Sequence, residues 1–295
     1  MKTNYNDRKI SIIGLGQMGK KIAELYVSAK FDVMVWNRTP SKAAGLANVG
    51  IAKSVEEAIN HGSLHIICVY DNTGTEEIFN QLGNKQILTS KTIINLTTGS
   101  PAEVESLEEM VTKAGGYYLN GAIQVAPDQM GKSATTILLG GKSTTFEKVH
   151  EDLKVLGGNL RHLGEKASAS SAMDLAALTW LYGSYVGLIY GIRLAQAFEL
   201  KLEDFGKIIE EVVPGFTDFF KHQINTVSAE NYDVTQSPLE ISVLATKRIA
   251  DTFESLPVAQ EFPQIISSIL QRTGSKYGGK GKELAIVLKA IERKS

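Results

Sequence analysis

A short glycine-rich segment near the N-terminus has the residue types and the spacing that bind phosphate groups. The segment Gly14-Leu15-Gly16-Gln17-Met18-Gly19 follows a β-branched apolar run that ends at Ile13. In this pattern the first glycine allows a tight turn, the second lets the backbone approach a pyrophosphate, and the third lets a helix pack close to the strand. The helix N-terminus then faces the phosphates. We therefore expect a dinucleotide to bind at Gly14, Leu15, Gly16, Gln17 and Met18.

A basic segment about 20 residues further on predicts which dinucleotide binds. NAD enzymes usually place Asp or Glu here to bond the ribose 2′-hydroxyl. This chain has Asn37-Arg38-Thr39, with Lys42 one helical turn beyond Arg38. A carboxylate would repel a 2′-phosphate, whereas a guanidinium can bond it bidentately. The pattern predicts NADPH as the cofactor, and the alternative is a solvated basic loop.

Polar residues follow two further apolar runs, at the expected ends of buried strands. Ligands of doubly wound sheets lie beyond the carboxyl ends of the strands. We therefore expect Val69, Tyr70 and Asn72 to flank the adenosine, and Thr97 and Thr98 to flank the nicotinamide. Alternatively, each of these residues could only stabilise the turn that follows its strand.

One acid stands alone in a long apolar helical stretch. Asp174 is the only acid between Glu165 and Glu199, about three turns into the helix. Tyr182 projects within about 80° of the same face by helical geometry. A buried carboxylate is costly and tends to mark a functional site. Asp174 and Tyr182 are therefore the candidate catalytic residues; the alternative is a surface acid beside a core tyrosine.

Alternating strand and helix patterns predict an α/β domain over residues 1–163. The expected strands lie in a doubly wound parallel sheet. Strands are expected at 10–13, 31–36, 64–70, 92–96, 117–119, 135–139 and 159–163. One helix is expected directly after the glycine segment, where Ile22, Ala23, Leu25 and Tyr26 have helical spacing. Further helices are expected at 40–47, 54–60, 73–82, 101–114 and 143–156.

A single long helix is expected over residues 164–200, which we interpret as an interdomain helix. Leu175 to Ile192 contains no charged residue, a length that just reaches a membrane span. Polar residues and glycines within it argue against that alternative. Gly183, Gly187 and Gly191 recur every four residues and favour close approach of a second helix, so we expect dimerisation here.

Residues 201–295 are expected to form an all-α helical bundle. Pro214 and Gly274 are expected to end two of its helices. The expected helices lie at 202–213, 216–228, 239–256, 258–273 and 283–293.

Composition excludes several classes of function. The net charge of −1 argues against a nucleic-acid partner. The single cysteine, Cys68, excludes a disulfide framework and favours a cytoplasmic location. The histidines show no metal-ligand spacing, and the chain has neither a serine-hydrolase elbow nor a zinc-protease motif. No secretion signal, metal or membrane partner is therefore expected.

These motifs together resemble the β-hydroxyacid dehydrogenase superfamily. The glycine segment with Asn37-Arg38-Thr39-Pro40 and the stretch Asn95 to Pro101 carry the general resemblance. The stretch Tyr118 to Pro127 with Met130-Gly131, and Ala172 to Ala176 around Asp174, are more narrowly similar to the imine reductase branch. The chain departs from that pattern at Met173, where an aromatic residue is common, and at Lys282, where an acid is common.

The resemblance implies an NADPH-dependent reduction of imines. It implies a Rossmann domain, a long interdomain helix and a helical bundle that is exchanged between the partners of a homodimer. It places Asp174 where hydroxyacid dehydrogenases keep a lysine, which suits a protonated, cationic imine. Tyr182 would help to hold or protonate the nitrogen. Thr98, Trp180, Phe216 and Phe220 are candidate walls of the substrate pocket.

Two other functions stay open from the sequence. One is a related dehydrogenase that reduces small carbonyl acids. The other is a non-catalytic NADPH-binding dimer that senses cofactor or redox state.

Overall fold

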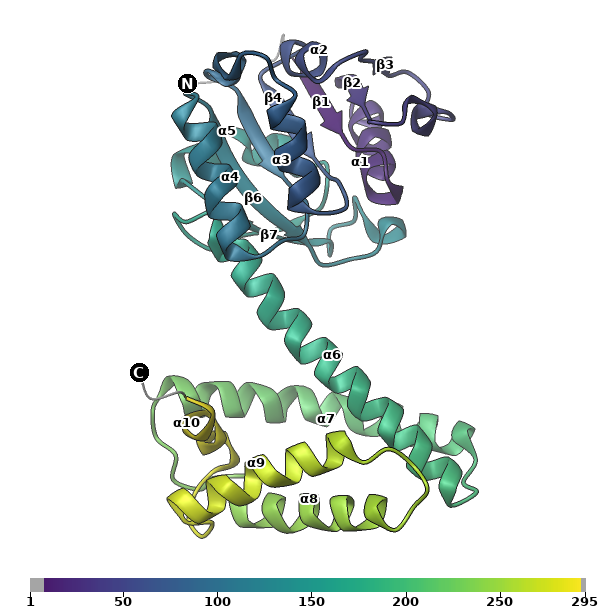
Figure 1. The fold of residues 1–295 in the computed structure, drawn as a ribbon, viewed down its shortest axis with the longest axis vertical. Helices are drawn as coiled ribbons and strands as arrows, with labels where there is room; N and C mark the ends of the chain where they lie inside the picture. Colours follow the sequence, from purple (N-terminus) through teal and green to yellow (C-terminus); the bar gives the residue numbers. More distant parts are fainter. Residues whose placement is uncertain (1–7, 293–295) are drawn as a thin grey trace. The chain divides into compact units, whose positions relative to one another are not determined.

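The computed structural model describes residues 8–292 of the chain (Figure 1). Contacts divide the chain into two compact units, Met1–Thr179 and Trp180–Ser295, and the division falls inside one continuous helix. The first unit contains the sheet and the second is helical in the part that the structure describes. The domain limits expected from the sequence stay a prediction, since unit borders inside a helix do not define them.

The first unit contains an eight-stranded sheet in the order β3-β2-β1-β4-β5-β6-β7-β8. All neighbouring strands are parallel except β6 and β7, which pair antiparallel. The strands are β1 Lys9–Ile13, β2 Asp32–Trp36, β3 Gly50–Ile51, β4 Leu64–Ile67, β5 Thr92–Asn95, β6 Tyr117–Ile123, β7 Thr136–Gly140 and β8 Asn159–His162.

Helices cover both faces of this sheet. The helices of the first unit are α1 Gln17–Ser28, α2 Val55–Asn60, α3 Asn72–Asn80, α4 Pro101–Lys113 and α5 Ser143–Leu153, with short 3₁₀ turns at Pro40–Ala43, Lys85–Leu88 and Pro127–Gln129. One apolar core packs α1 and α5 against the sheet, and a second packs α2, α3 and α4. The doubly wound α/β fold expected from the sequence is confirmed.

The sheet differs from the expected all-parallel arrangement at β7. A parallel partner needs a crossover, which is usually a helix. Only a 3₁₀ turn, Pro127–Gln129, stands between β6 and β7, so the chain returns antiparallel. The sequence pattern also missed β3, a two-residue edge strand, and the helix expected at 40–47 is a four-residue 3₁₀ turn.

The long helix α6 spans Ser168–Ala197 and contains 30 residues. Among the described residues, it is the one helix whose length and composition would let it cross a membrane. Its glycine stripe is covered in part by this chain itself. A Cβ at Gly187 would lie 3.5 Å from the Phe262 ring, and a Cβ at Gly191 would lie 3.1 Å from the Phe205 ring. The expected close approach of a second backbone is therefore replaced at these two positions by aromatic side chains.

The second unit is made of helices, of which the sequence pattern divided α7 into two and ended α9 too early. They are α7 Leu202–Ser228, α8 Leu239–Glu254, α9 Glu261–Tyr277, a 3₁₀ turn Leu284–Ile286 and α10 Val287–Ile291. Pro214 lies inside α7 and does not end it, because the apolar stripe continues past the missing N–H. Gly274 lies inside α9, where a Cβ would lie 3.4 Å from Val243 of α8. Gly274 therefore allows two helices to approach rather than ending one.

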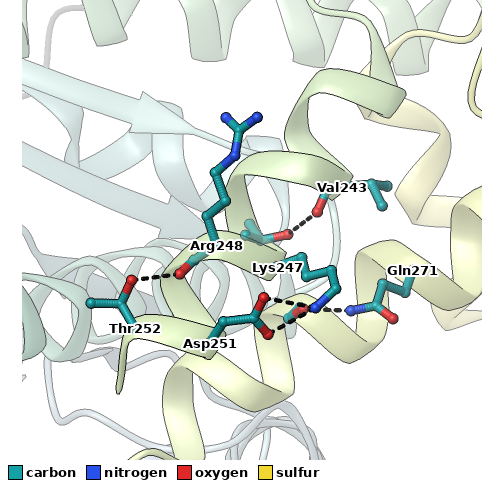
Figure 2. A network of polar contacts seen from close by, with 8 residues as sticks. Val243, Lys247, Arg248, Asp251, Thr252 and Gln271 are labelled. Carbon is teal, nitrogen blue, oxygen red and sulfur yellow. Dashed lines mark hydrogen bonds and ion pairs between the residues drawn. The ribbon is translucent and has the colours of Figure 1, made fainter. Parts of the chain in front are cut away.

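Helices α8 and α9 lie side by side and carry polar groups of their own (Figure 2). The Lys247 ammonium lies 2.9 and 2.7 Å from the two carboxylate oxygens of Asp251, one turn along α8. On α9, the Gln271 amide donates to the Ser267 hydroxyl at 2.8 Å. Each of these bonds joins residues of the same helix, so neither links α8 to α9.

A buried carboxylate holds the last part of the chain in place. Glu283 is fully buried and accepts hydrogen bonds from the backbone N–H groups of Thr235, Gln236 and Ser237 at 2.8–3.0 Å, and from the Gln223 amide at 2.8 Å. Burial acts to raise the pKa of this carboxyl, but these bonds to the ionised form outweigh it and lower the pKa to about 2. The loop before α8 is thus fixed to the start of the last helical segment.

We expect Glu283→Gln to lower the free energy of unfolding by about 1–3 kcal/mol, because the backbone donors lose a charged acceptor. Since the folded-state pKa is depressed, this contribution is present above pH 4.5, the ordinary value, and is lost as the pH falls towards about 2. Urea unfolding of both proteins at pH 7 and pH 3 measures it. The exposed control Glu210→Gln should change little, and equal stability of Glu283→Gln and the parent at pH 7 would contradict the assignment.

Candidate active site

The glycine segment after β1 forms a turn that only glycine fits at two positions. Gly14 has φ of +101°, and a Cβ there would lie 2.2 Å from the Cys68 carbonyl oxygen; a Cβ at Gly19 would lie 2.0 Å from the Gly14 carbonyl oxygen. A Cβ at Gly16, by contrast, would meet no described heavy atom within 4 Å. Contacts within the protein therefore do not require glycine at position 16. The space beside the Gly16 backbone is open to a ligand.

Helix α1 begins directly after this turn. Gly16 is its N-cap, and no described side chain bonds the N–H groups of its first turn. Uncapped N–H groups and the positive end of the helix dipole form a site for an anion. This backbone cradle fits the pyrophosphate of a dinucleotide.

A cleft of about 620 Å³ runs from the glycine turn across the ends of β2 and β4. This volume lies within the usual range for small-molecule sites. Its lining includes most of the residues predicted to bind cofactor: Gly14, Leu15, Gly16, Gln17, Met18, Asn37, Arg38, Thr39, Lys42, Val69 and Tyr70. The structure therefore brings together in one cleft side chains from three segments far apart in the sequence.

The residues after β2 divide into one positioning group and two cations. The Asn37 side chain accepts a hydrogen bond from the Leu15 N–H at 2.9 Å and donates to the Thr39 carbonyl at 3.0 Å. Asn37 thus ties the glycine turn to the basic segment. Arg38 and Lys42 line the cleft, and the Arg38 side chain is 82% exposed. Both cations line the cleft that an anionic ligand would enter, and the Arg38 guanidinium lies 3.4 Å from the Glu77 carboxylate.

Two predicted cofactor residues are buried and are not among the residues that line the cleft. Thr97 is buried, and its hydroxyl accepts a hydrogen bond from the Val69 N–H at 3.1 Å. Asn72 is buried, and its side-chain oxygen accepts from the Asn95 amide at 2.9 Å. Both residues thus bond to residues at or just after the ends of neighbouring strands. Thr98, predicted to face the substrate, is exposed.

The other wall of the cleft comes from α3 and the residues that flank it. The sequence pattern connected only the start of this segment with the adenosine. The segment lines the cleft with Asp71, Thr73, Gly74, Glu77, Ile78 and Gln81. Asp71 caps α3, since its carboxylate accepts from the Gly74 N–H at 2.8 Å. Tyr70 precedes it with 97% of its surface exposed. An aromatic ring held in solvent at a cleft edge suits stacking on a flat base.

The carboxylate of Asp174 is held by a residue that sequence reasoning missed. Asp174 lies near the start of α6 and is buried, with 6% of its surface exposed. The Gln124 amide, just after β6, donates to its Oδ1 at 2.7 Å. This bond fixes the orientation of the carboxylate and leaves the other oxygen without a described partner. A polar residue directly after an apolar strand was the signal available in the sequence.

The predicted aromatic residues lie in the second unit. Trp180 packs edge-on against Phe220, with ring centroids 6.2 Å apart, and Phe216 lies 6.2 Å from Phe220. Tyr182 follows Asp174 by eight residues on the same helix and is 63% exposed. All of these rings expose large apolar surface in the single chain.

Cys68 lines the cleft but is unsuited to nucleophilic chemistry. Burial raises the pKa of its thiol to about 11, so the thiolate is scarce at neutral pH. Among the described residues no cluster of His, Cys, Asp and Glu could hold a metal ion. The cleft thus offers a phosphate cradle and two cations. The carboxylate that Gln124 orients lies on α6 and is not among the residues that line this cleft.

Comparison with known protein families accounts for almost the whole chain. Residues 9–164 match the model of the NAD binding domain of 6-phosphogluconate dehydrogenase. Residues 166–293 match the model of the C-terminal domain of NADPH-dependent reductive aminase-like proteins. An NADPH-dependent reductive aminase from Aspergillus oryzae is 28% identical over 279 residues, covering 92% of this chain and 94% of that protein.

Solved structures show the same arrangement of elements. An imine reductase from Myxococcus stipitatus in complex with NADP⁺ is 25% identical, with a TM-score of 0.90 over 96% of this chain and 100% of that one. A reductive aminase from Aspergillus terreus in complex with NADPH and ethyl levulinate is 26% identical, with a TM-score of 0.88 over 96% and 99% of the two chains. The resemblance seen in the sequence is confirmed: the chain belongs to the family built on the NAD-binding domain of 6-phosphogluconate dehydrogenase, in the imine reductase branch with a reductive-aminase-like C-terminal domain.

Proposed function

We propose that this protein is an NADPH-dependent oxidoreductase that reduces the C=N bond of imines to amines. The observation that carries the proposal is Asp174, a buried carboxylate oriented by Gln124 at 2.7 Å in a chain of this family. An anion at this place suits an electrophile that is already cationic.

The identity of the cofactor is inferred from the residues that line the cleft and from the cofactors bound in related structures. The glycine turn fits a pyrophosphate, while Arg38 and Lys42 provide the positive charge that a 2′-phosphate requires. The imine reductase from Myxococcus stipitatus holds NADP⁺ and the reductive aminase from Aspergillus terreus holds NADPH. The chain uses the same cofactor.

The reaction needs one hydride and one proton. Bound NADPH supplies the hydride that the imine carbon accepts. An imine accepts hydride well only when its nitrogen is protonated, so the nitrogen is positive before the transfer. Asp174 either pairs with this iminium or supplies its proton, and Tyr182 helps to hold the nitrogen. The electron pair of the C=N bond then stays on nitrogen and neutralises it as the amine.

Carbonyl reduction is disfavoured by the same carboxylate. Hydride transfer to a carbonyl builds negative charge on oxygen, which a nearby anion would destabilise. Structures of the Aspergillus terreus enzyme contain dibenz[c,e]azepine, or cyclohexanone with allyl amine. These ligands agree with an imine substrate, and Thr98, Trp180, Phe216 and Phe220 are proposed to line its pocket.

We also propose that the active form is a homodimer with exchanged helical units. Along α6, large apolar side chains are exposed: Met173, Leu175, Trp180, Leu181, Tyr182, Tyr185, Val186, Leu188 and Ile189. A surface of this kind marks a contact with another protein. This helix lies within the matched reductive-aminase-like domain, so a second copy, rather than a membrane, is proposed to cover it. We propose a cytoplasmic location.

Arg38→Ala should remove the preference for NADPH. The parent protein should bind NADPH much more tightly than NADH, and the variant should lose at least tenfold in NADPH affinity, because a charged hydrogen-bond partner is worth about 1.5–3 kcal/mol. Fluorescence titration with both cofactors measures the effect. Equal affinities for NADPH and NADH in the parent would refute the role of the basic segment.

Asp174→Ala and Asp174→Asn should lower imine turnover by about two orders of magnitude, the scale of a lost proton-transfer group. A panel of cyclic imines that includes 2-methyl-1-pyrroline, followed by NADPH oxidation, tests the function and the residue together. NADPH affinity should stay unchanged and serves as the control for folding. Full turnover in the variants, or reduction of semialdehyde acids in preference to every imine, would refute the proposal.

The protein should be a dimer at micromolar concentration, and Val186→Glu should shift it towards monomer because it places charge on the apolar surface of α6. Sedimentation velocity measures both states. Lys53→Glu, an exposed change in the first unit, is the matched control and should leave the dimer intact. A stable, folded parent monomer would contradict helix exchange.

A further inference from the structure

The cleft that fits the adenosine carries as many carboxylates as cations. Its charged lining residues are Arg38 and Lys42 on one wall and Asp71 and Glu77 on the other. This balance is unexpected for a site that must bind a 2′-phosphate, which carries a charge of about −1.5 to −2 at pH 7. The presence of Asp71 and of Glu77 in this cleft therefore needs an explanation for each residue.

Asp71 has a structural task that Glu77 lacks. The Asp71 carboxylate caps α3 through the Gly74 N–H, where the helix dipole offsets its charge. Glu77 lies near the middle of α3, and its Oε2 is 3.4 Å from the Arg38 Nη1. The paired side chains are 57% and 82% exposed. An exposed, long ion pair of this kind adds little to stability, so folding does not explain Glu77.

The ion pair joins the two walls of the cleft at the residue expected to bind the 2′-phosphate. Arg38 has five donors in a planar fork, and Glu77 engages one of them. A phosphate that approaches this fork meets a carboxylate already placed on it. The phosphate must then displace the carboxylate or share the guanidinium with a like charge.

We propose that Glu77 is a specificity-determining residue that competes with the cofactor 2′-phosphate for Arg38 and thereby weakens NADP(H) binding. The inference rests on the proposed function, since it assumes that NADPH occupies this cleft. Its consequence is kinetic. NADP⁺ must leave after each turnover, and a carboxylate that takes over Arg38 as the phosphate departs favours release.

Glu77→Gln should raise NADPH and NADP⁺ affinity about three- to tenfold in low salt, because the competing charge is removed while the side chain keeps its size. NADH affinity should change less than twofold, since NADH carries no 2′-phosphate. Calorimetry with the full-length protein, and stopped-flow release of NADP⁺, measure affinity and rate without turnover. The gain should lie mainly in slower release.

The matched control is Glu76→Gln, the neighbouring exposed acid on the same helix, which does not line the cleft. It makes the same change in net charge and should alter NADPH affinity less than twofold. An equal gain from both variants would assign the effect to net charge and overturn the proposal. Unchanged or weaker NADPH binding by Glu77→Gln would also overturn it.

An Arg38→Ala background tests competition against simple repulsion. If Glu77 acts by holding Arg38, then Glu77→Gln should gain much less NADPH affinity when Arg38 is absent. An equal gain in both backgrounds would overturn the competition for Arg38. Failure of the parent protein to bind NADP⁺ at all would refute the proposed function itself, whereas normal binding with no response to Glu77→Gln refutes only this inference.

Discussion

The close approach of three backbone segments at the glycine turn is the constraint on which the rest of the site depends. The Gly14 carbonyl lies where a Cβ on Gly19 would stand, and the Cys68 carbonyl lies where a Cβ on Gly14 would stand. The turn, the first residues of α1 and the end of β4 are therefore in backbone contact. This contact aims the free N–H groups of α1 into the cleft, and the Asn37 bond to Leu15 carries the basic segment to the same place. These residues contribute by holding the backbone and the basic segment in place, and not by unusual reactivity of their own.

The parts of the fold that the sequence predicts are those with local causes. The glycine turn, the basic segment and the buried strands each depend on residues within a few positions of one another, and the structure has them as expected. The direction of β7 depends on the absence of a crossover helix, and the continuity of α7 through Pro214 depends on an apolar stripe longer than the local break. Local rules treat proline and glycine as stops, whereas α7 continues through Pro214 and α9 continues through Gly274, which faces Val243 of α8.

The site residues divide in the same way, into those with local sequence signals and those that depend on distant partners. Arg38 and Lys42 could be found because cofactor chemistry prescribes their distance from the glycines. Gln124 and Glu77 could not, because each acts through a partner 50 or 39 positions away in the sequence. Thr97 and Asn72 stay predictions as cofactor-binding residues. They stand at strand ends, where the Thr97 hydroxyl accepts a bond from the Val69 N–H and the Asn72 side-chain oxygen accepts one from the Asn95 amide. A strand end fixes where a residue lies and not which way its side chain points.

The two charged regions require opposite signs, and the chain supplies them from different elements. In the proposed function a phosphate needs cations, for which we propose Arg38 and Lys42 after β2, whereas an iminium needs an anion, for which we propose Asp174 of α6. Asp174 is buried and held by one short bond, so its position is fixed before a substrate arrives. Arg38 is exposed and exchangeable. A group that takes part in the chemical step gains from being fixed, because reorganisation would add to the barrier. Arg38, which must let the oxidised cofactor leave, gains from having Glu77 as a second partner. The buried Asp174 and the exposed Arg38 therefore suit different roles.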